Sequence, residues 1–156
     1  MLVGHAMNTH KAVPLLLRAT GATTEVLAFR HPQAGLQLVK GTIHVGESAK
    51  DAALRELAEE SGLQETSFTR DLGTWASGYE GQTWHFQQVQ CRATAPESWE
   101  HLTQDGGGQV FHFFWHPLRS APSPEWHPVY RAALAELCHR LGIQESTHAA
   151  SVPSAA

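Results

Sequence analysis

The first forty residues alternate between short apolar runs and turn residues. The runs Ala12–Arg18 and Glu25–Arg30 have the length of β-strands, and the turn Gly21–Thr24 between them predicts a hairpin. After a loop at His31–Gly35, the run Leu36–Lys40 predicts a short third strand. The amino-terminal part of the chain is therefore expected to contribute three strands, the last of which leads directly into a helical segment.

That segment has the periodicity of an amphipathic helix. The pattern predicts a helix from Ala49 to Ser61, with Ser48 as its N-cap and Gly62 in the left-handed conformation that ends it. At about 100° per residue, one side is expected to pack against the protein through Leu54, Leu57, Ala58 and Ser61. The other side is expected to stay exposed and carries Ala52, Arg55, Glu56, Glu59 and Glu60.

The second half of the chain predicts further strands and a terminal helix. The apolar runs that define these elements are Phe68–Ser77, Thr83–Ala93, Gln109–Pro117 and the helical Pro128–Leu141. The parity of the apolar positions flips at Gln87–Gln88, which predicts either a β-bulge or a strand that changes the face it buries. The stretch Ala95–Gly108 is expected to be a polar loop, and residues 145–156 a mobile tail.

Composition and charge narrow the classes of protein that fit. A chain of 156 residues with 42% hydrophobic content predicts one globular domain, over residues 1–144. No apolar run is long enough to span a membrane, and no secretory signal is visible. Together with two isolated cysteines, Cys91 and Cys138, this predicts a cytoplasmic protein. The net charge of −4, with three lysines and no basic cluster, argues against a long nucleic acid as the substrate.

The predicted helix concentrates negative charge. The exposed side spans an arc of about 140° and carries Glu56, Glu59 and Glu60. Like charges at i and i+4, as in Glu56 and Glu60, destabilise a helix by a few tenths of a kcal/mol. A divalent cation would remove that repulsion, and Mg²⁺ prefers carboxylate oxygens, water and substrate phosphates. The alternative is a solvated acidic face, with Arg55 in a surface ion pair.

The residues before the helix favour a divalent cation site over a solvated acidic face. From Gly41 to Leu63 the chain reads GTIHVGESAKDAALRELAEESGL, which fills all nine restricted positions of the pattern GX5EX7REUXEEXGU, where U is a bulky aliphatic residue. This pattern is the Nudix box, so the chain resembles a Nudix hydrolase. The resemblance implies an α/β fold, the Nudix α/β/α sandwich, with a mixed sheet between helices and a loop–helix–loop motif. The predicted order of strands, helix, strands and helix is consistent with it.

The resemblance also implies roles for individual residues. Glu56, Glu59 and Glu60 match the glutamates that bind Mg²⁺ or Mn²⁺, and the carbonyl of Gly41 matches a backbone ligand. Arg55 matches an arginine that orients a glutamate, and Glu47 a glutamate that supports the loop. The catalytic residues are therefore expected to be Glu56, Arg55 and Glu59, with water attacking a phosphorus atom and a carboxylate, assigned to Glu56, taking its proton.

Further residues are candidates for contacts with the substrate or for an extra acid. Lys40 could touch a phosphate, and the loop acids Asp105 and Glu80 could act as an additional ligand or base. A nucleobase needs an aromatic surface, for which the candidates are Trp75, Tyr79, Trp84 and Phe86. Arg30 could clamp a phosphate. At the start of the motif, many family members have a proline shortly before the glycine that matches Gly41. This chain has Val39-Lys40-Gly41 there, without a proline.

The function that the sequence predicts is a metal-dependent pyrophosphohydrolase. Its partner would be a small nucleotide-like substrate: a nucleoside triphosphate, a dinucleoside polyphosphate or a nucleotide sugar. Two alternatives are a Nudix domain that senses a nucleotide without cleaving it, and an enzyme that removes pyrophosphate from a 5′-RNA end. Family members often form homodimers, but the sequence defines no interface and indicates no membrane partner.

Overall fold

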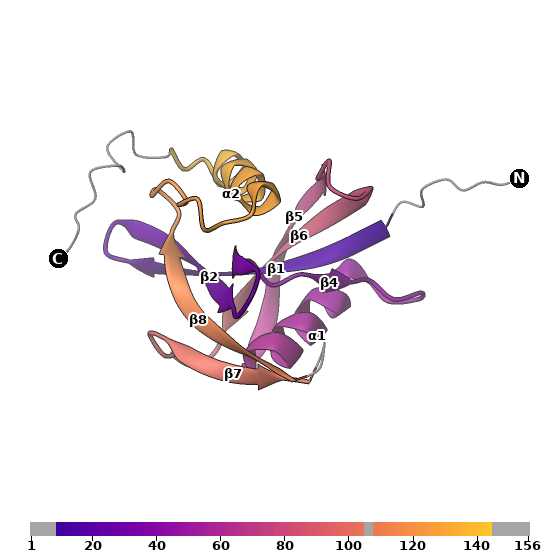
Figure 1. Ribbon diagram of the computed structural model, residues 1–156, viewed down its shortest axis with the longest axis horizontal. Helices are drawn as coiled ribbons and strands as arrows, with labels where there is room; N and C mark the ends of the chain where they lie inside the picture. Colours follow the sequence, from indigo (N-terminus) through magenta and orange to yellow (C-terminus); the bar gives the residue numbers. More distant parts are fainter. Residues whose placement is uncertain (1–8, 105–107, 145–156) are drawn as a thin grey trace, which may run out of the picture.

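A computed structural model describes residues 9–104 and 108–144 (Figure 1). The predicted tail and Asp105 lie outside these residues. The strands are β1 Thr9–Thr20, β2 Thr23–His31, β3 Gly35–Gln37, β4 Gly41–Thr42, β5 Thr66–Ala76, β6 Gln82–Cys91, β7 Trp99–Thr103 and β8 Gln109–Pro117. The helices are α1 Ala49–Ser61 and α2 Pro128–Leu141. Both helices and β8 begin and end where the sequence predicts.

The strands form one mixed sheet in the order β5-β6-β1-β2-β8-β7, with β3 paired to β2 and β4 to β1. The predicted hairpin is confirmed, because β1 and β2 pair antiparallel from Leu17↔Val26 to Thr20↔Thr23. Among the described strands, β1 and β6 form the one parallel pair. These two strands therefore run side by side through the centre of the sheet.

The two helices cover opposite faces of the sheet (Figure 1). Alternate residues of β1 divide between the faces, so that Val13 and Leu15 pack toward α2 while Ala12 and Leu16 pack toward α1. Each of these four side chains is 2% exposed or less. Burial of an aliphatic side chain contributes about 1.5–3 kcal/mol, so the central strand anchors both layers.

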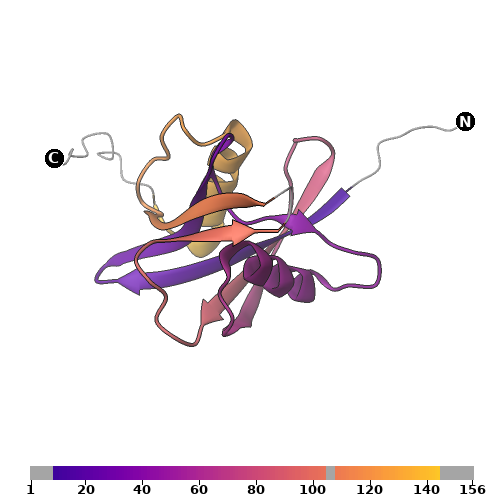
Figure 2. The same ribbon diagram turned by 60° about the horizontal axis from the view of Figure 1, so that its bottom comes forward.

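The ends of β1, β2, β5 and β6 differ from the predicted ones by one to three residues, and two predicted segments differ more. The third strand covers only Gly35–Gln37 rather than Leu36–Lys40, because its pairing with β2 ends at Phe29↔Gln37. Leu38 and Val39 are buried beyond that end. The stretch Ala95–Gly108 is not a loop throughout, since β7 lies within it and pairs with β8 at the sheet edge (Figure 2). The sequence of β7, Trp-Glu-His-Leu-Thr, does not alternate cleanly between apolar and polar residues, and this concealed the strand.

The parity flip in β6 reflects a change of buried face. The parallel pairing of β6 with β1 is continuous from Thr9↔Gln82 to Leu16↔Val89, so β6 itself has no bulge. Trp84 and Phe86 pack toward α2, whereas Val89 packs toward α1. The register shifts lie in the partner strand β5, between Phe68 and Arg70 and between Asp71 and Gly73.

Helix α2 packs one face against the sheet. Tyr130, Ala133, Leu134 and Leu137 are buried, and Gly142 ends the helix in the left-handed conformation. In the part of the chain that the structure describes, neither helix is long and apolar enough to cross a membrane.

Candidate active site

A short loop places the 41–63 motif against the sheet. β4 pairs with β1 through Ala12↔Gly41, which fixes the start of the motif. Glu47 then accepts a hydrogen bond from the His44 backbone N–H at 3.0 Å, which closes the loop before the helix. The predicted N-cap is confirmed, because Ser48 accepts from the Asp51 backbone N–H at 3.0 Å.

Arg55 ties the loop to the helix. Its guanidinium donates from Nε and Nη2 to the two carboxylate oxygens of Glu47, at 2.7 and 2.9 Å. Nη2 also donates to the Thr42 carbonyl at 3.0 Å, and Nη1 donates to Glu56 at 2.9 Å and to Glu59 at 3.3 Å. A guanidinium has five N–H donors, and these five hydrogen bonds use all of them. The Arg55 guanidinium holds the pKa of Glu47 well below its usual range, at about 2.

Glu56 is buried, which the helical pattern did not predict. It is 7% exposed, and Ala52, one turn earlier, is 0% exposed, so the assignment of both to a solvent face is wrong. The reason is that α1 packs its small residues tightly onto Ala12 of β1. Gly41 permits this approach, since a Cβ at position 41 would collide with the Glu56 carboxyl group.

The environment of Glu56 opposes its negative charge. Burial raises the pKa of Glu56 above its ordinary value, although hydrogen bonds with Arg55 and Glu60 act in the opposite direction. Glu56 and Glu60 are thus hydrogen-bonded to each other, and the Glu56 carboxyl group lies against the backbone of Gly41. Two adjacent carboxyl groups, one of them desolvated, form a site where positive charge is stabilising.

These donors fit a hard divalent cation in their chemistry. The three glutamates of α1 and the Gly41 carbonyl offer oxygen ligands only, which is the set that Mg²⁺ and Mn²⁺ prefer. Glu59 is more open than Glu56, with 47% of its side chain exposed. In residues 9–104 and 108–144, no three acidic, histidine or cysteine side chains already surround a common point.

Lys40 lies next to this cluster in an aromatic setting. Its ammonium lies 4.6 Å from the centre of the Trp84 ring and 5.5 Å from the centres of Tyr79 and Tyr130, and it donates to Gln82 Oε1 at 3.1 Å. Burial lowers the pKa of Lys40 to about 8, helped by nearby Lys11.

A cavity of about 340 Å³ adjoins Lys40 and Glu60. Its other lining residues come from four parts of the chain: Phe29, Ala34, Gln37, Leu38, Tyr79, Phe111, His127, Val129 and Tyr130. Ligand cavities have volumes of about 300–1,000 Å³, so this cavity has room for a small ligand beside the glutamates.

Three further candidates from the sequence, Trp84, Glu80 and Arg30, do not line the cavity beside Lys40. Trp84 is 0% exposed, so it cannot offer a base a stacking surface, and that expectation is wrong. Glu80 is exposed on the turn between β5 and β6 and hydrogen-bonds Tyr79. Arg30 pairs with Glu125 at 2.7 Å instead of facing the motif.

Sequence reasoning missed several residues of this cavity. Gln37 and His127 are ninety positions apart in the chain, and nothing in either local sequence marks them. The loop before α2 reaches β3 through a backbone bond from the Leu36 N–H to the Glu125 carbonyl at 3.2 Å, which brings the two together. Only the tertiary fold could reveal this juxtaposition.

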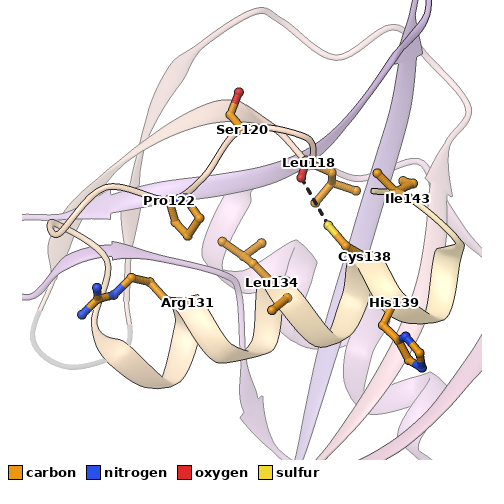
Figure 3. A pocket seen from close by; sticks show the side chains of 9 residues that line it. Leu118, Ser120, Pro122, Arg131, Leu134, Cys138, His139 and Ile143 are labelled. Carbon is orange, nitrogen blue, oxygen red and sulfur yellow. Dashed lines mark hydrogen bonds between the residues drawn. The ribbon is translucent and has the colours of Figure 1, made fainter. Parts of the chain in front are cut away.

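A larger cavity of about 490 Å³ lies elsewhere, between α2 and the segment that follows β8 (Figure 3). There the Cys138 thiol donates to the Leu118 carbonyl at 3.2 Å. None of the predicted site residues lines this cavity. Three of the candidate site residues, Lys40, Glu60 and Tyr79, line the cavity beside Lys40 instead.

Comparison with known proteins agrees with this architecture. A sequence model of the NUDIX domain matches residues 8–137. The chain therefore belongs to the Nudix family and has its α/β/α sandwich fold. It is a Nudix hydrolase, and such enzymes generally use divalent metal ions. No curated protein matches the sequence significantly.

Solved structures share the fold at low sequence identity. An ADP-ribose pyrophosphatase from Streptococcus suis 89-1591 is 15% identical, with 84% of this chain and 92% of that one covered and a TM-score of 0.58. A UDP-X diphosphatase is 12% identical, with 92% and 68% covered and a TM-score of 0.63. An Ap4A hydrolase from C. elegans is 18% identical, with 87% and 95% covered and a TM-score of 0.56.

Proposed function

We propose that the protein is a divalent-metal-dependent pyrophosphohydrolase that cleaves the diphosphate linkage of a nucleoside diphosphate joined to another group. The observation that carries the proposal is the buried contact of Glu56 with Arg55, Glu60 and the backbone at Gly41. A helix that served only for packing would gain nothing from a buried carboxylate, whose desolvation costs free energy.

The chain supplies a full set of groups for this chemistry. The Gly41 carbonyl and the carboxylates of Glu56, Glu59 and Glu60 would hold Mg²⁺ or Mn²⁺. Once bound, the ion would neutralise phosphoryl oxygens and lower the pKa of the attacking water. Arg55 positions Glu56 and Glu59, and Glu47 in turn fixes Arg55 through two hydrogen bonds.

Glu56 is the candidate general base. The resemblance of the motif implies this role, and a base works best when its pKa lies near the pH at which the enzyme operates. Without a bound ion, burial raises the pKa of Glu56 above its ordinary value. Water attacks the phosphorus atom, Glu56 takes its proton, and the second phosphate leaves with the remaining group. Lys40, which lies near Glu60, would contact a substrate phosphate.

Three substrate classes enter the proposal: nucleoside triphosphates, dinucleoside polyphosphates and nucleotide sugars. The names of the similar structures, an ADP-ribose pyrophosphatase, a UDP-X diphosphatase and an Ap4A hydrolase, support the last two classes. The net charge of −4 disfavours a long RNA.

The test measures phosphate or pyrophosphate release from these three classes and from 5′-triphosphorylated RNA, with Mg²⁺ or Mn²⁺. Wild type is run beside Glu60→Gln and the control Glu136→Gln, which alters a helix glutamate paired with Arg140 on α2. We expect Glu60→Gln to lower kcat by roughly a hundredfold or more while the protein stays folded, since loss of one electrostatic partner of the transition state has that size. Near-normal activity in Glu60→Gln would refute the metal assignment. Binding of a nucleotide without cleavage by wild type would instead favour a sensor.

A further inference from the structure

The carboxyl-terminal end of α1 carries negative charge where a helix tolerates it least. Glu59 and Glu60 lie in its last turn, which contains no basic residue, whereas the last turn of α2 contains His139 and Arg140. The free carbonyls at this end of a helix form the negative pole of its dipole, so carboxylates there are unfavourable. Hydrogen-bond donors from outside the helix offset this cost when they bind the free carbonyls.

Strand β7 supplies such a donor. It lies beside α1 at one edge of the sheet (Figure 1), and the Trp99 indole Nε1–H donates to the Ser61 carbonyl at 2.8 Å. Ser61 directly follows Glu60, at a position that the Nudix pattern leaves unrestricted. Its hydroxyl also donates to the Leu57 carbonyl at 2.6 Å and accepts the Leu63 N–H at 3.1 Å. The backbone that follows Glu60 is therefore held by a side chain of β7.

The Trp99 ring is itself fixed by packing. It stacks on Phe113 of β8, with the ring centres 5.2 Å apart and an angle of 11° between the planes. Both rings belong to the apolar cluster that Leu57 enters from α1. Gly62 also approaches β7 closely, since a Cβ at position 62 would lie 2.7 Å from His101 Nδ1. The indole therefore holds the end of α1 from a well-packed position.

Glu60 is the motif residue nearest to this bond in the chain. Its carboxyl group is hydrogen-bonded to that of Glu56, and it lines the cavity beside Lys40. Ser61 is only 1% exposed, so its carbonyl could not simply exchange the indole N–H for water. Because helix ends fray when their last carbonyls lack partners, loss of this bond would move the Glu60 backbone away from Glu56.

From these contacts we infer that Trp99 is a positioning residue for the metal site, whose indole N–H holds the last turn of α1 so that Glu60 meets the ion together with Glu56. The inference rests on the proposed function, because it takes these two glutamates as metal ligands. Trp99 acts through the backbone of Ser61, so it does not have to touch the ion. Metal binding and the indole hydrogen bond are then coupled, and each strengthens the other by the same factor.

The first experiment compares two tryptophans that make the same kind of bond. The Trp115 indole N–H donates to the Pro96 carbonyl at 3.0 Å, and its ring packs against the same apolar cluster as Trp99. Phenylalanine keeps an aromatic ring and removes the donor. Mn²⁺ affinity is measured by electron paramagnetic resonance in wild type, Trp99→Phe and Trp115→Phe, with melting temperatures from circular dichroism. We expect Trp99→Phe to weaken Mn²⁺ binding roughly tenfold, the low end for a lost supporting hydrogen bond. Trp115→Phe should leave Mn²⁺ affinity unchanged even if it melts at a similarly lower temperature.

Kinetics with one cleaved substrate give a readout that a merely structural role would not move. At limiting Mn²⁺ the kcat of Trp99→Phe should fall below that of Trp115→Phe, and excess Mn²⁺ should restore it. Equal Mn²⁺ affinity in Trp99→Phe and wild type, or an equal loss in both variants, would overturn the positioning role and leave the hydrolase intact. Wild type that binds no Mn²⁺ would instead refute the proposed metal site, and the positioning role with it.

A further measurement needs no variant, so it decides the matter even if Trp99→Phe does not fold. Nuclear magnetic resonance follows solvent exchange of the Trp99 and Trp115 indole N–H groups in wild type, with and without saturating Mg²⁺. Because the coupling is reciprocal, Mg²⁺ should slow exchange at Trp99 roughly tenfold and leave Trp115 unchanged. Unchanged exchange at Trp99, or equal slowing at both indoles, would overturn the inference.

Discussion

Helices α1 and α2 are nearly equal in length and cover opposite faces of one sheet, yet they bury different chemistry. α2 buries six residues without a charge: Val129, Tyr130, Ala133, Leu134, Leu137 and Cys138. α1 buries five: Ala52, Ala53, Glu56, Leu57 and Ser61. One helix therefore contributes mainly apolar packing, while the other uses small residues to bring a carboxylate close to the backbone of β4.

The difference shows how a stable domain can carry an unfavourable charge cluster. Burial of Glu56 and the proximity of three carboxylates oppose folding, and Arg55 offsets only part of that cost. The apolar layer under α2 supplies stability without contributing a charged residue to the motif. The comparison leads to four predictions, from the largest expected effect to the smallest.

The largest effect should come from one core leucine on each helix. Leu57 and Leu137 are both 0% exposed, and replacement of a buried leucine by alanine costs about 2–5 kcal/mol. We expect both Leu57→Ala and Leu137→Ala to lower the melting temperature, measured by circular dichroism. Only Leu57→Ala should also reduce kcat per folded molecule, because its neighbour Glu56 belongs to the motif. An unchanged melting temperature in Leu57→Ala would mean that this face of α1 is not core.

The second prediction compares two arginines with similar geometry. Arg55 bridges α1 to the 41–47 loop, and Arg140 bridges α2 to the Leu72 and Thr74 carbonyls of β5 at 2.9 and 2.8 Å. Lysine keeps the charge but cannot reproduce the planar fork. We expect Arg55→Lys to lower kcat by roughly a hundredfold and Arg140→Lys to leave kcat unchanged with a small loss of stability. Equal kcat losses would show that the two bridges have the same structural role.

The third prediction concerns the close approach of β4 to α1. A methyl group at Gly41 would collide with Glu56, whereas one at Gly21, in the β1–β2 turn, would meet nothing within 4 Å. We expect Gly41→Ala to lower kcat by roughly tenfold or more, as small displacements of catalytic groups do. Gly21 has φ of 63°, so Gly21→Ala should cost only about 1–2 kcal/mol of backbone strain and leave kcat intact.

The fourth prediction is a pH dependence on the α2 side, which is the smallest of the four effects within any one pH unit. His116 is 7% exposed and packs edge-on against Trp126, and burial lowers its pKa to about 4 from an ordinary 6.5. Between these values the unfolded chain binds more protons than the folded one, so acid removes stability. Over pH 6.5 to 4 the free energy of unfolding should fall by up to about 1.4 kcal/mol per pH unit. In His116→Phe this part of the slope should vanish in urea titrations. An identical slope in both proteins would contradict the assignment.

The sequence predicts the elements whose signals are local. Ser48 and Gly62 mark the ends of α1, and apolar runs of strand length mark β1, β2 and β8. The candidate metal-binding glutamates could likewise be assigned from the sequence, because the Nudix motif is a continuous stretch of chain. Long-range features were not predictable: β7 gains its place from pairing with β8, and Glu56 is buried because β4 docks on β1. Gln37 and His127 meet only after the loop before α2 reaches β3.

The most direct test of the central claim is a Mn²⁺ titration followed by electron paramagnetic resonance, without substrate. Wild type, Glu56→Gln and the α2 control Glu136→Gln are compared, with folding checked by circular dichroism. The account predicts saturable binding in wild type and Glu136→Gln and affinity at least roughly tenfold weaker in Glu56→Gln. Equal affinity in all three proteins would contradict the assignment of the 41–63 motif as the metal site.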